Sequence, residues 1–260
     1  MTSFRLIGPG RAGRSLAIAL SGAGWGLAGM LGRDDDVRSA AHDVDFLVIA
    51  TPDRAVAGVA ARVDPSPSTV VLHLAGSLGL DVLAPHPHRA SVHPLVTLPE
   101  PGVGASRLVA GGFFAVAGDP RAAELVSALG GTGLVVPDDA RPAYHAAACM
   151  AANHVVALLG QVERVAADAG IPLAAFMGLA RGAVDDVASA GPSGALTGPV
   201  ARGDRATIER HRAVLDEAER PAYDALVELS RRLVERENGA GSAASPRVGR
   251  EDQTELAPCT

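Results

Sequence analysis

The sequence predicts an α/β fold, in which an N-terminal domain built on a parallel β-sheet is followed by an all-α C-terminal domain. Short apolar runs recur through residues 1–137 and are separated by segments long enough for crossover helices. Such runs are typical of parallel strands that helices cover on both faces. After residue 137 the strand signals stop, and apolar residues recur with the period of long helices. A length of 260 residues fits two domains of modest size.

The predicted elements set the domain boundaries. Strands are expected at residues 4–7, 27–31, 46–50, 70–74, 91–94 and 113–117, with helices at 14–23, 54–63 and 120–129. Long helices are expected at residues 143–169, 174–189 and 205–236. From residue 239 the chain is rich in Gly, Ala, Ser, Pro and charge without periodicity, which is typical of a flexible tail. We therefore expect domains at 1–137 and 138–238, and a tail at 239–260.

Charge and composition exclude several classes of function. The formal net charge of −6 argues against a nucleic-acid partner, which requires a basic surface. We see no signal peptide and no stretch of about 18 uncharged apolar residues, so we expect a cytoplasmic protein without a membrane segment. The two cysteines, Cys149 and Cys259, lie in a predicted helix and in the tail, which argues against a structural disulfide. All 23 basic residues are arginine, so mechanisms that need a lysine are excluded.

A glycine motif follows the first predicted strand and opens the next helix. Its residues are Gly8, Pro9, Gly10, Arg11, Ala12 and Gly13. In a Rossmann domain the first glycine allows the tight turn, the second lets the pyrophosphate of a dinucleotide approach the backbone, and the third permits close helix packing. A tight turn without a ligand would use the same glycines. We interpret the motif as a dinucleotide site and expect all six residues to contact the cofactor.

The end of the second strand indicates which dinucleotide binds. Arg33 stands where an arginine can hold the 2′-phosphate of NADP, whereas Asp34 could instead bind the ribose hydroxyls of NAD. We favour NADP. Thr51, Pro52 and Asp53 follow the third strand, at the carboxyl edge where ligands bind in open α/β sheets. We expect these three residues to line the cofactor groove, although a turn that starts a helix has the same sequence pattern.

Six stretches of the chain together resemble Rossmann-like proteins that carry a C-terminal DUF2520 domain. They are residues 7–13, 50–53, 73–77, 91–95, 144–148 with Asn153, and 195–204. The resemblance covers residues 4 to about 235. The two-domain plan of that family is similar to ketopantoate reductase, 6-phosphogluconate dehydrogenase, pyrroline-5-carboxylate reductase and prephenate dehydrogenase. The resemblance implies a nicotinamide-dependent oxidoreductase, and it does not identify a substrate.

The chain departs from these better-known relatives at one position. Many of them carry Lys-x-x-x-Asn on the first helix after the Rossmann domain, with the lysine as general acid or base. Here Asn153 is present, but Cys149 stands four residues before it. The lysine mechanism therefore cannot be carried over, and another group must handle the proton.

His93 is the leading candidate for that role. Residues 91–94 form a strand that ends in a His-Pro turn near the carboxyl edge of the sheet, and an unperturbed imidazole with a pKa of about 6.5 suits proton exchange. The stretch is similar to the His-Pro motif of prephenate dehydrogenases, and Gly76-Ser77 resembles their Gly-Ser element. This resemblance implies that Ser77 and His93 flank the substrate oxygen. Alternatively, His93 caps a turn and Ser77 starts a helix.

Two further segments could contact the substrate. His145, Cys149 and Asn153 share one helix face. If that helix borders the cleft between the domains, His145 and Asn153 would reach the substrate. Alternatively this face packs internally, which is the interpretation we prefer for Cys149. Thr197 and Arg202 lie in a glycine-rich loop that could bind a substrate carboxylate.

The same loop leads to Asp204, which we expect to cap the helix that follows. A capped helix with a solvated arginine is the alternative interpretation of this loop. His86 and His88 lack a third ligand at a convincing spacing, so we expect no metal site.

These observations favour an NADP-dependent oxidoreductase that acts on a small carboxylate-bearing metabolite, with a 2-keto acid of the ketopantoate type preferred. A prephenate-like dehydrogenase or an imine reductase is the first alternative. A non-catalytic NADP-binding regulatory protein is the second. The long Ala- and Leu-rich helices expose more apolar surface than a small domain can cover, which predicts a homodimer formed through the helical domain.

Overall fold

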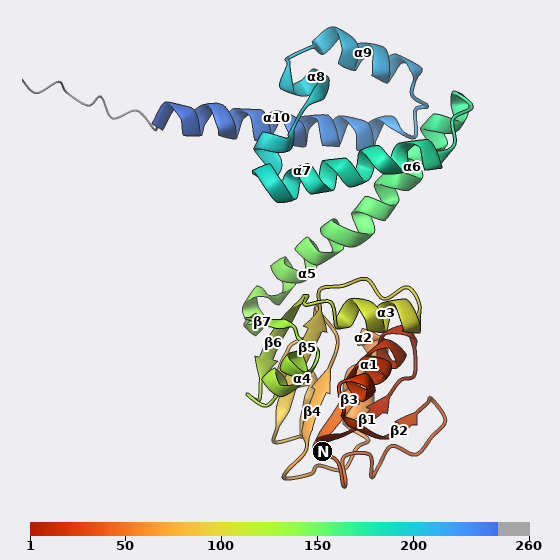
Figure 1. The fold of residues 1–260 in the computed structure, drawn as a ribbon, viewed down its shortest axis with the longest axis vertical. Coiled ribbons are helices and arrows are strands. Elements are labelled where there is room, and N and C mark those ends of the chain that lie inside the picture. Colours follow the sequence, from red (N-terminus) through yellow and green to blue (C-terminus); the bar gives the residue numbers. More distant parts are fainter. Residues whose placement is uncertain (244–260) are drawn as a thin grey trace, which may run out of the picture. The chain divides into compact units, whose positions relative to one another are not determined.

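The structure is a computed structural model that describes the backbone of residues 1–243 and side chains through residue 236 (Figure 1). The chain forms two compact units, which divide between Val155 and Val156. We call them the sheet unit and the helical unit and describe each by itself. The composition changes near residue 138, where the last strand has ended, whereas the spatial division falls one helix later.

The sheet unit contains a seven-stranded sheet in the order β2-β1-β3-β4-β5-β6-β7. The strands are β1 (Ser3–Ile7), β2 (Gly26–Leu31), β3 (Phe46–Ile49), β4 (Val70–His73), β5 (Arg89–Pro94), β6 (Phe113–Gly118) and β7 (Thr132–Val135). All six predicted strands are present, which confirms the α/β fold class. The sheet is mixed rather than purely parallel, because β6 pairs antiparallel with β5. The strand β7 escaped prediction because its side chains are all exposed and show no apolar alternation.

The helices of the sheet unit are α1 (Arg11–Gly22), α2 (Asp53–Ala60), α3 (Pro101–Leu108), α4 (Ala122–Ala128) and α5 (Arg141–Cys149), with short 3₁₀ turns at η1 (Leu80–Leu83) and η2 (Asp138–Ala140). Helix α3 was not predicted, although its start carries a clear signal. The Glu100 side chain accepts hydrogen bonds from the amides of Gly102 and Val103, and Pro101 occupies the first turn. An acceptor at the cap followed by proline is a typical helix start.

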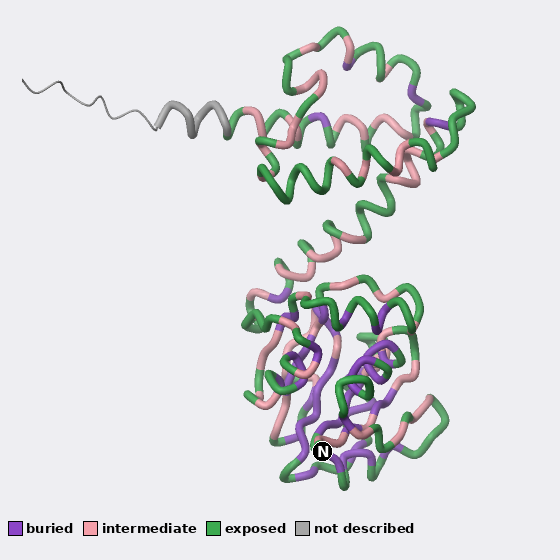
Figure 2. The backbone as a smooth tube through the Cα atoms, viewed as in Figure 1, coloured by how far each residue is buried: buried purple, intermediate pink, exposed green. Residues whose placement is uncertain are grey.

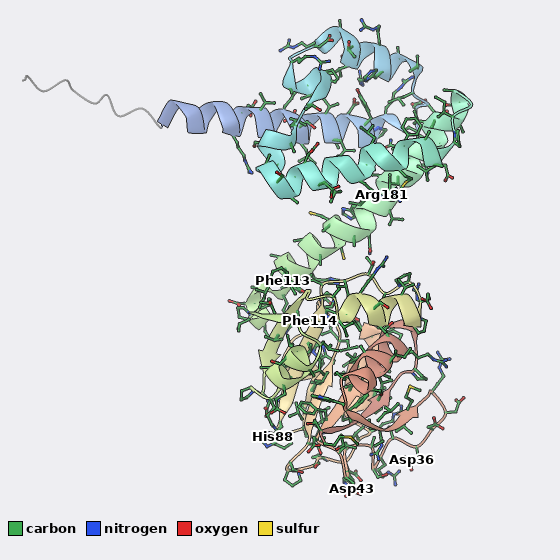
Figure 3. The ribbon with its side chains drawn as sticks, viewed as in Figure 1. Asp36, Asp43, His88, Phe113, Phe114 and Arg181 are labelled. Atoms are coloured by element: carbon green, nitrogen blue, oxygen red, sulfur yellow. The ribbon has the colours of Figure 1, made fainter. Side chains whose placement is uncertain are left out.

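Hydrophobic side chains cover the sheet on both faces, and Figure 2 shows the strands as the most buried part of the unit. Neighbouring residues of a strand point to opposite faces, so Leu6 packs with α1 and α3 whereas Ile7 packs on the α2 side. On β6 the same alternation buries Phe114 completely and leaves Phe113 53% exposed (Figure 3). The doubly covered strands form a rigid platform whose carboxyl ends present the functional loops.

The helical unit contains α6 (Val155–Asp168), η4 (Leu173–Phe176), α7 (Met177–Ala195), α8 (Gly198–Ala201), α9 (Arg205–Val214) and α10 (Arg220–Ala243). The single helix predicted at 205–236 is wrong, because two helices occupy this range. Leu215 has an extended backbone, and the Asp216 side chain accepts a hydrogen bond from the amide of Ala218, so a turn separates α9 from α10. Helix α10 continues to Ala243, which corrects the start of the predicted tail; residues 244–260 lie outside the described residues.

One helical stretch bears on the expectation about membrane segments. The stretch Asp138–Asp168 is long and apolar enough to cross a membrane by length and composition, with a mean hydropathy of 1.2 in its most apolar window. Alanine raises the average there, whereas His145 and Asn153 are polar residues within the same stretch. Both line the pocket described below. One such stretch is weak evidence for a membrane span.

Candidate active site

The glycine turn has the backbone geometry that a dinucleotide site requires. Gly8 has a φ of +97°, and a Cβ atom there would lie 2.8 Å from the carbonyl oxygen of Ala50. A Cβ atom at Gly13 would lie 2.9 Å from the side chain of Leu6, so only glycine allows α1 to pack this close to β1. Gly10 caps α1 without a side-chain acceptor, and no acidic residue occupies the first turn. The amides at this helix start are therefore free for an anion.

The end of β2 places the predicted cofactor-selecting residues next to this turn. The carbonyl of Leu31 accepts a hydrogen bond from the amide of Gly8, at 2.9 Å, which joins the two loops. Arg33 and Asp34 are both exposed. Asp35 accepts a hydrogen bond from the amide of Gly32 and so holds the loop in place. Arg33 and Asp34 are therefore both accessible to solvent in the loop after β2.

The loops after β3 and β4 are tied together. The Ser77 hydroxyl donates a hydrogen bond of 2.7 Å to Asp53, the first residue of α2. Ser77 does not line the pocket that contains His93, so the structure pairs Ser77 with Asp53 rather than with His93. Thr51 lies against Gly8 through its backbone, and its buried hydroxyl has no hydrogen-bond partner among the described residues. Of the three residues predicted to line the cofactor groove, Thr51 thus lies against the glycine turn, and Asp53 is bound to Ser77.

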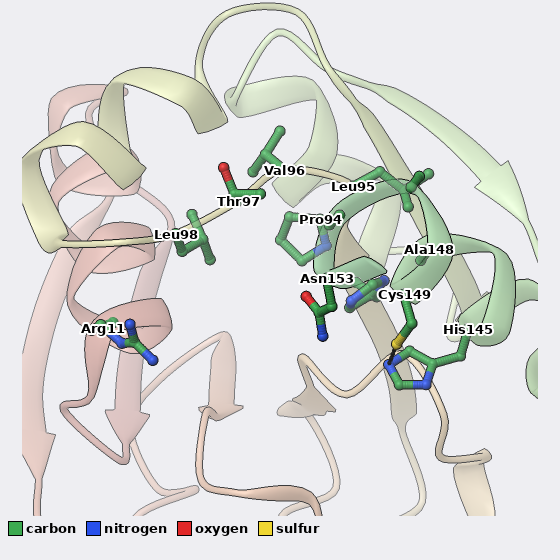
Figure 4. A pocket seen from close by; sticks show the side chains of 13 residues that line it. Arg11, Pro94, Leu95, Val96, Thr97, Leu98, His145, Ala148, Cys149 and Asn153 are labelled. Atoms are coloured by element: carbon green, nitrogen blue, oxygen red, sulfur yellow. Dashed lines mark hydrogen bonds between the residues drawn. The ribbon is translucent and has the colours of Figure 1, made fainter. Parts of the chain in front are cut away.

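A pocket of about 490 Å³ lies in the sheet unit beside the glycine turn (Figure 4). Three segments line it: the first residue of α1, the end of β5 with the chain that follows, and the helix from α5 onward. The lining residues are Arg11, His93, Pro94, Leu95, Val96, Thr97, Leu98, His145, Ala148, Cys149, Ala151, Ala152 and Asn153. Arg11 is the single arginine among them and no carboxylate is present, so the pocket favours an anionic ligand.

His93 makes a hydrogen bond that the sequence did not reveal. Its Nδ1 atom lies 2.5 Å from the hydroxyl of Tyr144, and the two rings meet edge to face. Burial above all, and then the charges of His145 and Arg141, lower the pKa of His93 from 6.5 to about 4. Burial also raises the pKa of the Tyr144 hydroxyl. At neutral pH the pair therefore consists of an uncharged imidazole and an uncharged phenol.

Gly76 allows two histidines to approach each other. A Cβ atom at this position would lie 2.8 Å from Cδ2 of His145 and 2.9 Å from Cε1 of His93. The rings of His93 and His145 lie 6.0 Å apart between centroids. In the predicted Gly-Ser element, Gly76 is thus the residue that contacts the two histidines. The presence of glycine at this position was the one sign in the sequence of such a close approach.

The helix that follows α5 changes its winding at the pocket. Residues Met150–His154 form a π-helix, η3, between α5 and α6. A π turn closes with i→i+5 hydrogen bonds and is found frequently at functional sites. His145, Cys149 and Asn153 all line the pocket, as their spacing predicted. Cys149 is half-buried, and its Sγ lies 3.9 Å from Nε2 of His145, so it faces the pocket rather than packing internally.

The remaining candidates lie elsewhere. Thr197 precedes α8 and Arg202 follows it, and both side chains are exposed in the helical unit. Asp204 caps α9 by accepting a hydrogen bond from the amide of Thr207, which confirms the predicted cap. His86 and His88 point to different partners, the carbonyl of Ala60 and the carboxylate of Asp119.

Two residues of the site escaped sequence reasoning. Tyr144 stood within the stretch that resembles the family, but nothing in the sequence placed its hydroxyl against a residue 51 positions earlier. Arg141 is 1% exposed, although an arginine before Pro142 at a helix start reads as a surface residue. Tyr144 and Arg141 both lie on α5, the first long helix after the last strand of the sheet.

Part of the chain matches a family of known sequences. Residues 113–229 match the family model described as a domain of unknown function (DUF2520). The matched range begins at β6, so it includes the end of the sheet as well as most of the helices. No curated protein matches the chain.

Solved structures share the fold over nearly the whole chain. Protein TM1727 from Thermotoga maritima is 24% identical with a TM-score of 0.69, covering 90% of this chain and 99% of that one. Protein BF3122 from Bacteroides fragilis, which its name assigns provisionally to the NADP oxidoreductases, is 18% identical with a TM-score of 0.73, covering 89% and 98%. The 1-pyrroline-5-carboxylate reductase of Streptococcus pyogenes is 12% identical with a TM-score of 0.61, covering 88% and 98%. At these identities the likeness is one of fold.

Proposed function

Since the chain carries a DUF2520 domain behind a Rossmann sheet, we propose that it is an NADP-dependent oxidoreductase for a small substrate that bears a carboxylate. The reacting group of that substrate is a C=N or C=O double bond. The observation that carries this proposal is a single pocket that joins the start of α1, through Arg11, to His93 and Asn153. A dinucleotide bound at the glycine turn would therefore lie beside the polar groups that chemistry requires.

The residues at the glycine turn fit a nicotinamide cofactor. The constricted Gly8 and Gly13 positions and the free amides at the start of α1 suit the pyrophosphate. Arg33 would bind the 2′-phosphate, which is why we favour NADP over NAD. When bound, the cofactor supplies or accepts a hydride.

Arg11 would hold the substrate by its carboxylate. Its side chain extends toward the pocket from one side, while His145, Cys149 and Asn153 approach from the other (Figure 4). A planar guanidinium binds a carboxylate through two parallel hydrogen bonds. The Asn153 amide can donate to the reacting oxygen or nitrogen of the substrate, and Leu95, Val96 and Leu98 give that side of the pocket an apolar lining.

His93 acts in this proposal as a neutral hydrogen-bond donor rather than as an imidazolium acid. A pKa of about 4 leaves almost no charged imidazole at neutral pH. If the Tyr144 hydroxyl donates to Nδ1, the ring carries its proton on Nε2, which can donate to the substrate. As the reacting nitrogen or oxygen of the substrate gains negative charge, the Nε2 proton passes to it and the phenol proton passes to Nδ1, which leaves His93 neutral and Tyr144 as a phenolate. The proton thus comes from Tyr144 and travels through His93.

We place a carboxylate-bearing imine first among the substrates. The S. pyogenes enzyme acts, by its name, on a pyrroline carboxylate, a compound that combines a C=N bond with a carboxylate. The 2-keto acid of the ketopantoate type, which the sequence favoured, finds no support in the three similar structures and becomes the second candidate. Both substrates fit a cationic pocket with neutral donors.

A turnover assay tests the proposal. Purified protein would be incubated with NADPH and a panel of cyclic imines and 2-keto acids, each with and without its carboxylate, and oxidation of NADPH would be followed. We expect turnover only with the carboxylate-bearing members and at least tenfold loss in kcat/KM for Arg11→Met. Tight NADPH binding without turnover on any member would instead support a regulatory NADP-binding protein.

We further propose that the protein is a homodimer that forms through the helical unit and works in the cytoplasm. Large apolar side chains on α6 and α7 are exposed, among them Val156, Leu179 and Val184 at 71%, 74% and 62%. Large exposed apolar side chains on two helices suit a protein–protein interface.

A further inference from the structure

A buried polar layer lies beneath the pocket in the sheet unit. His73 and Ser91 are partners across the β4–β5 pair, and His93 follows Ser91 by two residues, so the three side chains project from the same face of the sheet. His73 and Ser91 are fully buried. Arg141 comes to this layer from the start of α5, close enough for its charge to lower the pKa of both His73 and His93.

Arg141 is held in place by a short network. Its Nε donates to Oδ1 of Asp138 at 3.0 Å, and Oδ2 of the same carboxylate accepts from the amide of Leu80, also at 3.0 Å. The side chain of Arg141 is 1% exposed. Its Nη1 and Nη2 atoms are buried and have no hydrogen-bond partner among the described residues. A buried guanidinium with two unpartnered nitrogens is costly, so the structure needs a compensating reason to keep it.

We propose that Arg141 is a positioning residue for the His93–Tyr144 pair: its permanent positive charge, three residues from Tyr144 on α5, disfavours a charged His93 and stabilises the phenolate that Tyr144 becomes when its proton moves to His93. This inference deepens the proposed function and rests on it for the role of the pair. A guanidinium keeps its charge at every pH at which the protein folds. Arg141 is also the first residue of α5, so the positive end of that helix adds to its field. A second positive charge on His93 is correspondingly unfavourable.

The other charged groups around His93 do not replace Arg141. Two other histidines act on His93, namely His145 from α5 and His73 from β4. Each repels a positive charge on His93 only when it is itself protonated. Asp53 at the start of α2 acts in the opposite direction and raises the pKa of His93. Asp138 is the ion-pair partner of Arg141 and partly offsets its charge. Arg141 is therefore the one permanent cation among the groups whose charges act on His93 in the described structure.

The test is an NMR titration of the histidine side chains in the full-length protein, with the His93 signal assigned by its loss in His93→Asn. The wild-type signal should titrate near pH 4. In Arg141→Met the proton affinity of His93 should rise by roughly tenfold, the size expected when a nearby buried unit charge is removed. Arg141→Lys retains the charge and should restore the wild-type midpoint. Arg121→Met, which removes a partly exposed arginine bound to Asp119, is the matched control and should leave it unchanged.

An unchanged midpoint in a folded Arg141→Met protein would overturn the inference, and so would an Arg141→Lys protein that titrates like Arg141→Met. If Arg141→Met does not fold, Asp138→Asn provides the second test. Removal of the counter-charge should keep His93 neutral at pH 4, where the wild-type residue is half protonated. A half-protonated His93 in that variant would overturn the inference.

The titration needs no substrate, so its failure is separate from failure of the proposed function. If the substrate panel shows no turnover while the midpoint moves as expected, only the assigned reaction is wrong. If a substrate is found, the acid limb of kcat should move upward by about one pH unit in Arg141→Met.

Discussion

The two units of this protein bury their apolar residues to very different depths. In the sheet unit, Phe4, Leu6, Phe46 and Phe114 are fully buried, together with most of the strand residues around them. In the helical unit, through residue 236, the buried apolar side chains are Ala166, Ile208, Leu215 and Val227, each still 5–8% exposed. The same unit leaves large apolar side chains in contact with solvent on every long helix. The sheet unit thus completes its own core, whereas the helical unit does not.

This difference separates the two tasks that we assign to the molecule. The glycine turn, the pocket and the buried polar layer all belong to the sheet unit, where close packing can hold a neutral imidazole and a buried guanidinium in place. The helical unit offers exposed apolar surface, which suits association. Substitutions in the first unit should therefore change chemistry, and substitutions in the second should change assembly.

The largest effect is expected at His93. His93→Ala should lower turnover on an identified substrate by about 10²- to 10⁴-fold, because the proton path to the substrate is lost. NADPH affinity, measured by fluorescence titration, should stay nearly intact. His145→Ala is the control, since His145 lines the same pocket without contacting Tyr144 through a hydrogen bond. If His93→Ala retains full turnover and His145→Ala does not, His145 is the proton donor instead of the His93–Tyr144 pair.

Core substitutions compare the two units directly. Phe114→Ala should cost about 3–5 kcal/mol of unfolding free energy, because it leaves a cavity among fully buried side chains. Ile208→Ala should fall at the low end for its type, about 2 kcal/mol, because its surroundings can relax toward solvent. Urea unfolding followed by Trp25 fluorescence reports the sheet unit, since Trp25 packs on Phe46 there, and circular dichroism reports the helices. If both substitutions lowered the unfolding free energy by the same amount, the two units would not differ in core packing, and our division of tasks would lose its basis.

The stability of the sheet unit should depend on pH through its buried histidines. Burial lowers the pKa of His73, His86 and His93, so the unfolded chain binds protons that the folded protein does not. The unfolding free energy should therefore have its full value above pH 6.5 and decline as the pH falls below it. His93 alone contributes a loss of about 3 kcal/mol by pH 4. Urea titrations at pH 7 and pH 4.5 check this, and a stability that does not fall would contradict it. His93→Asn should show the weaker dependence.

Assembly should respond to the helical unit. Leu179→Glu on α7 should raise the dimer dissociation constant by about 10- to 100-fold, since it replaces a buried leucine contact worth about 1.5–3 kcal/mol. Val214→Glu on α9 is the control, because Val214 is as exposed, at 80%, but lies apart from the α6 and α7 residues in the chain. Sedimentation velocity measures both. A wild-type protein that sediments only as a 26.3 kDa species at micromolar concentration would refute the dimer.

Arg33 should affect cofactor preference alone, and its substitution should leave turnover chemistry and assembly untouched. Arg33→Ala should weaken NADPH binding by about 1.5–3 kcal/mol while NADH affinity stays the same, because only NADPH carries the 2′-phosphate. Fluorescence titrations with both cofactors measure the difference. An unchanged preference would move the assignment to NAD with Asp34 as the ribose ligand. Asp34→Ala is the matched variant that separates the two cases.

Sequence reasoning was strongest where a pattern is local. The strand–glycine–helix order placed Gly8 and Gly13, and both positions prove to be too constricted for any side chain. The spacing of His145 and Asn153 predicted that they would face the same pocket. The pairing of Ser77 was different: the resemblance implied His93 as its partner, but the structure gives it Asp53. Which loop a hydroxyl meets depends on how β4 and α2 end in space, and no spacing along the chain reports this.

By itself, the sequence determined the α/β class, the glycine turn, the absence of a lysine and the presence of a histidine at the end of β5. Only the tertiary structure decided that β6 runs antiparallel, that Tyr144 meets His93, and that Arg141 is buried beneath the pocket. The physical reason is the separation along the chain between the residues that interact. Periodicity and turn chemistry act between residues a few positions apart, whereas burial and the electric field at His93 come from groups about 50 positions away in the chain.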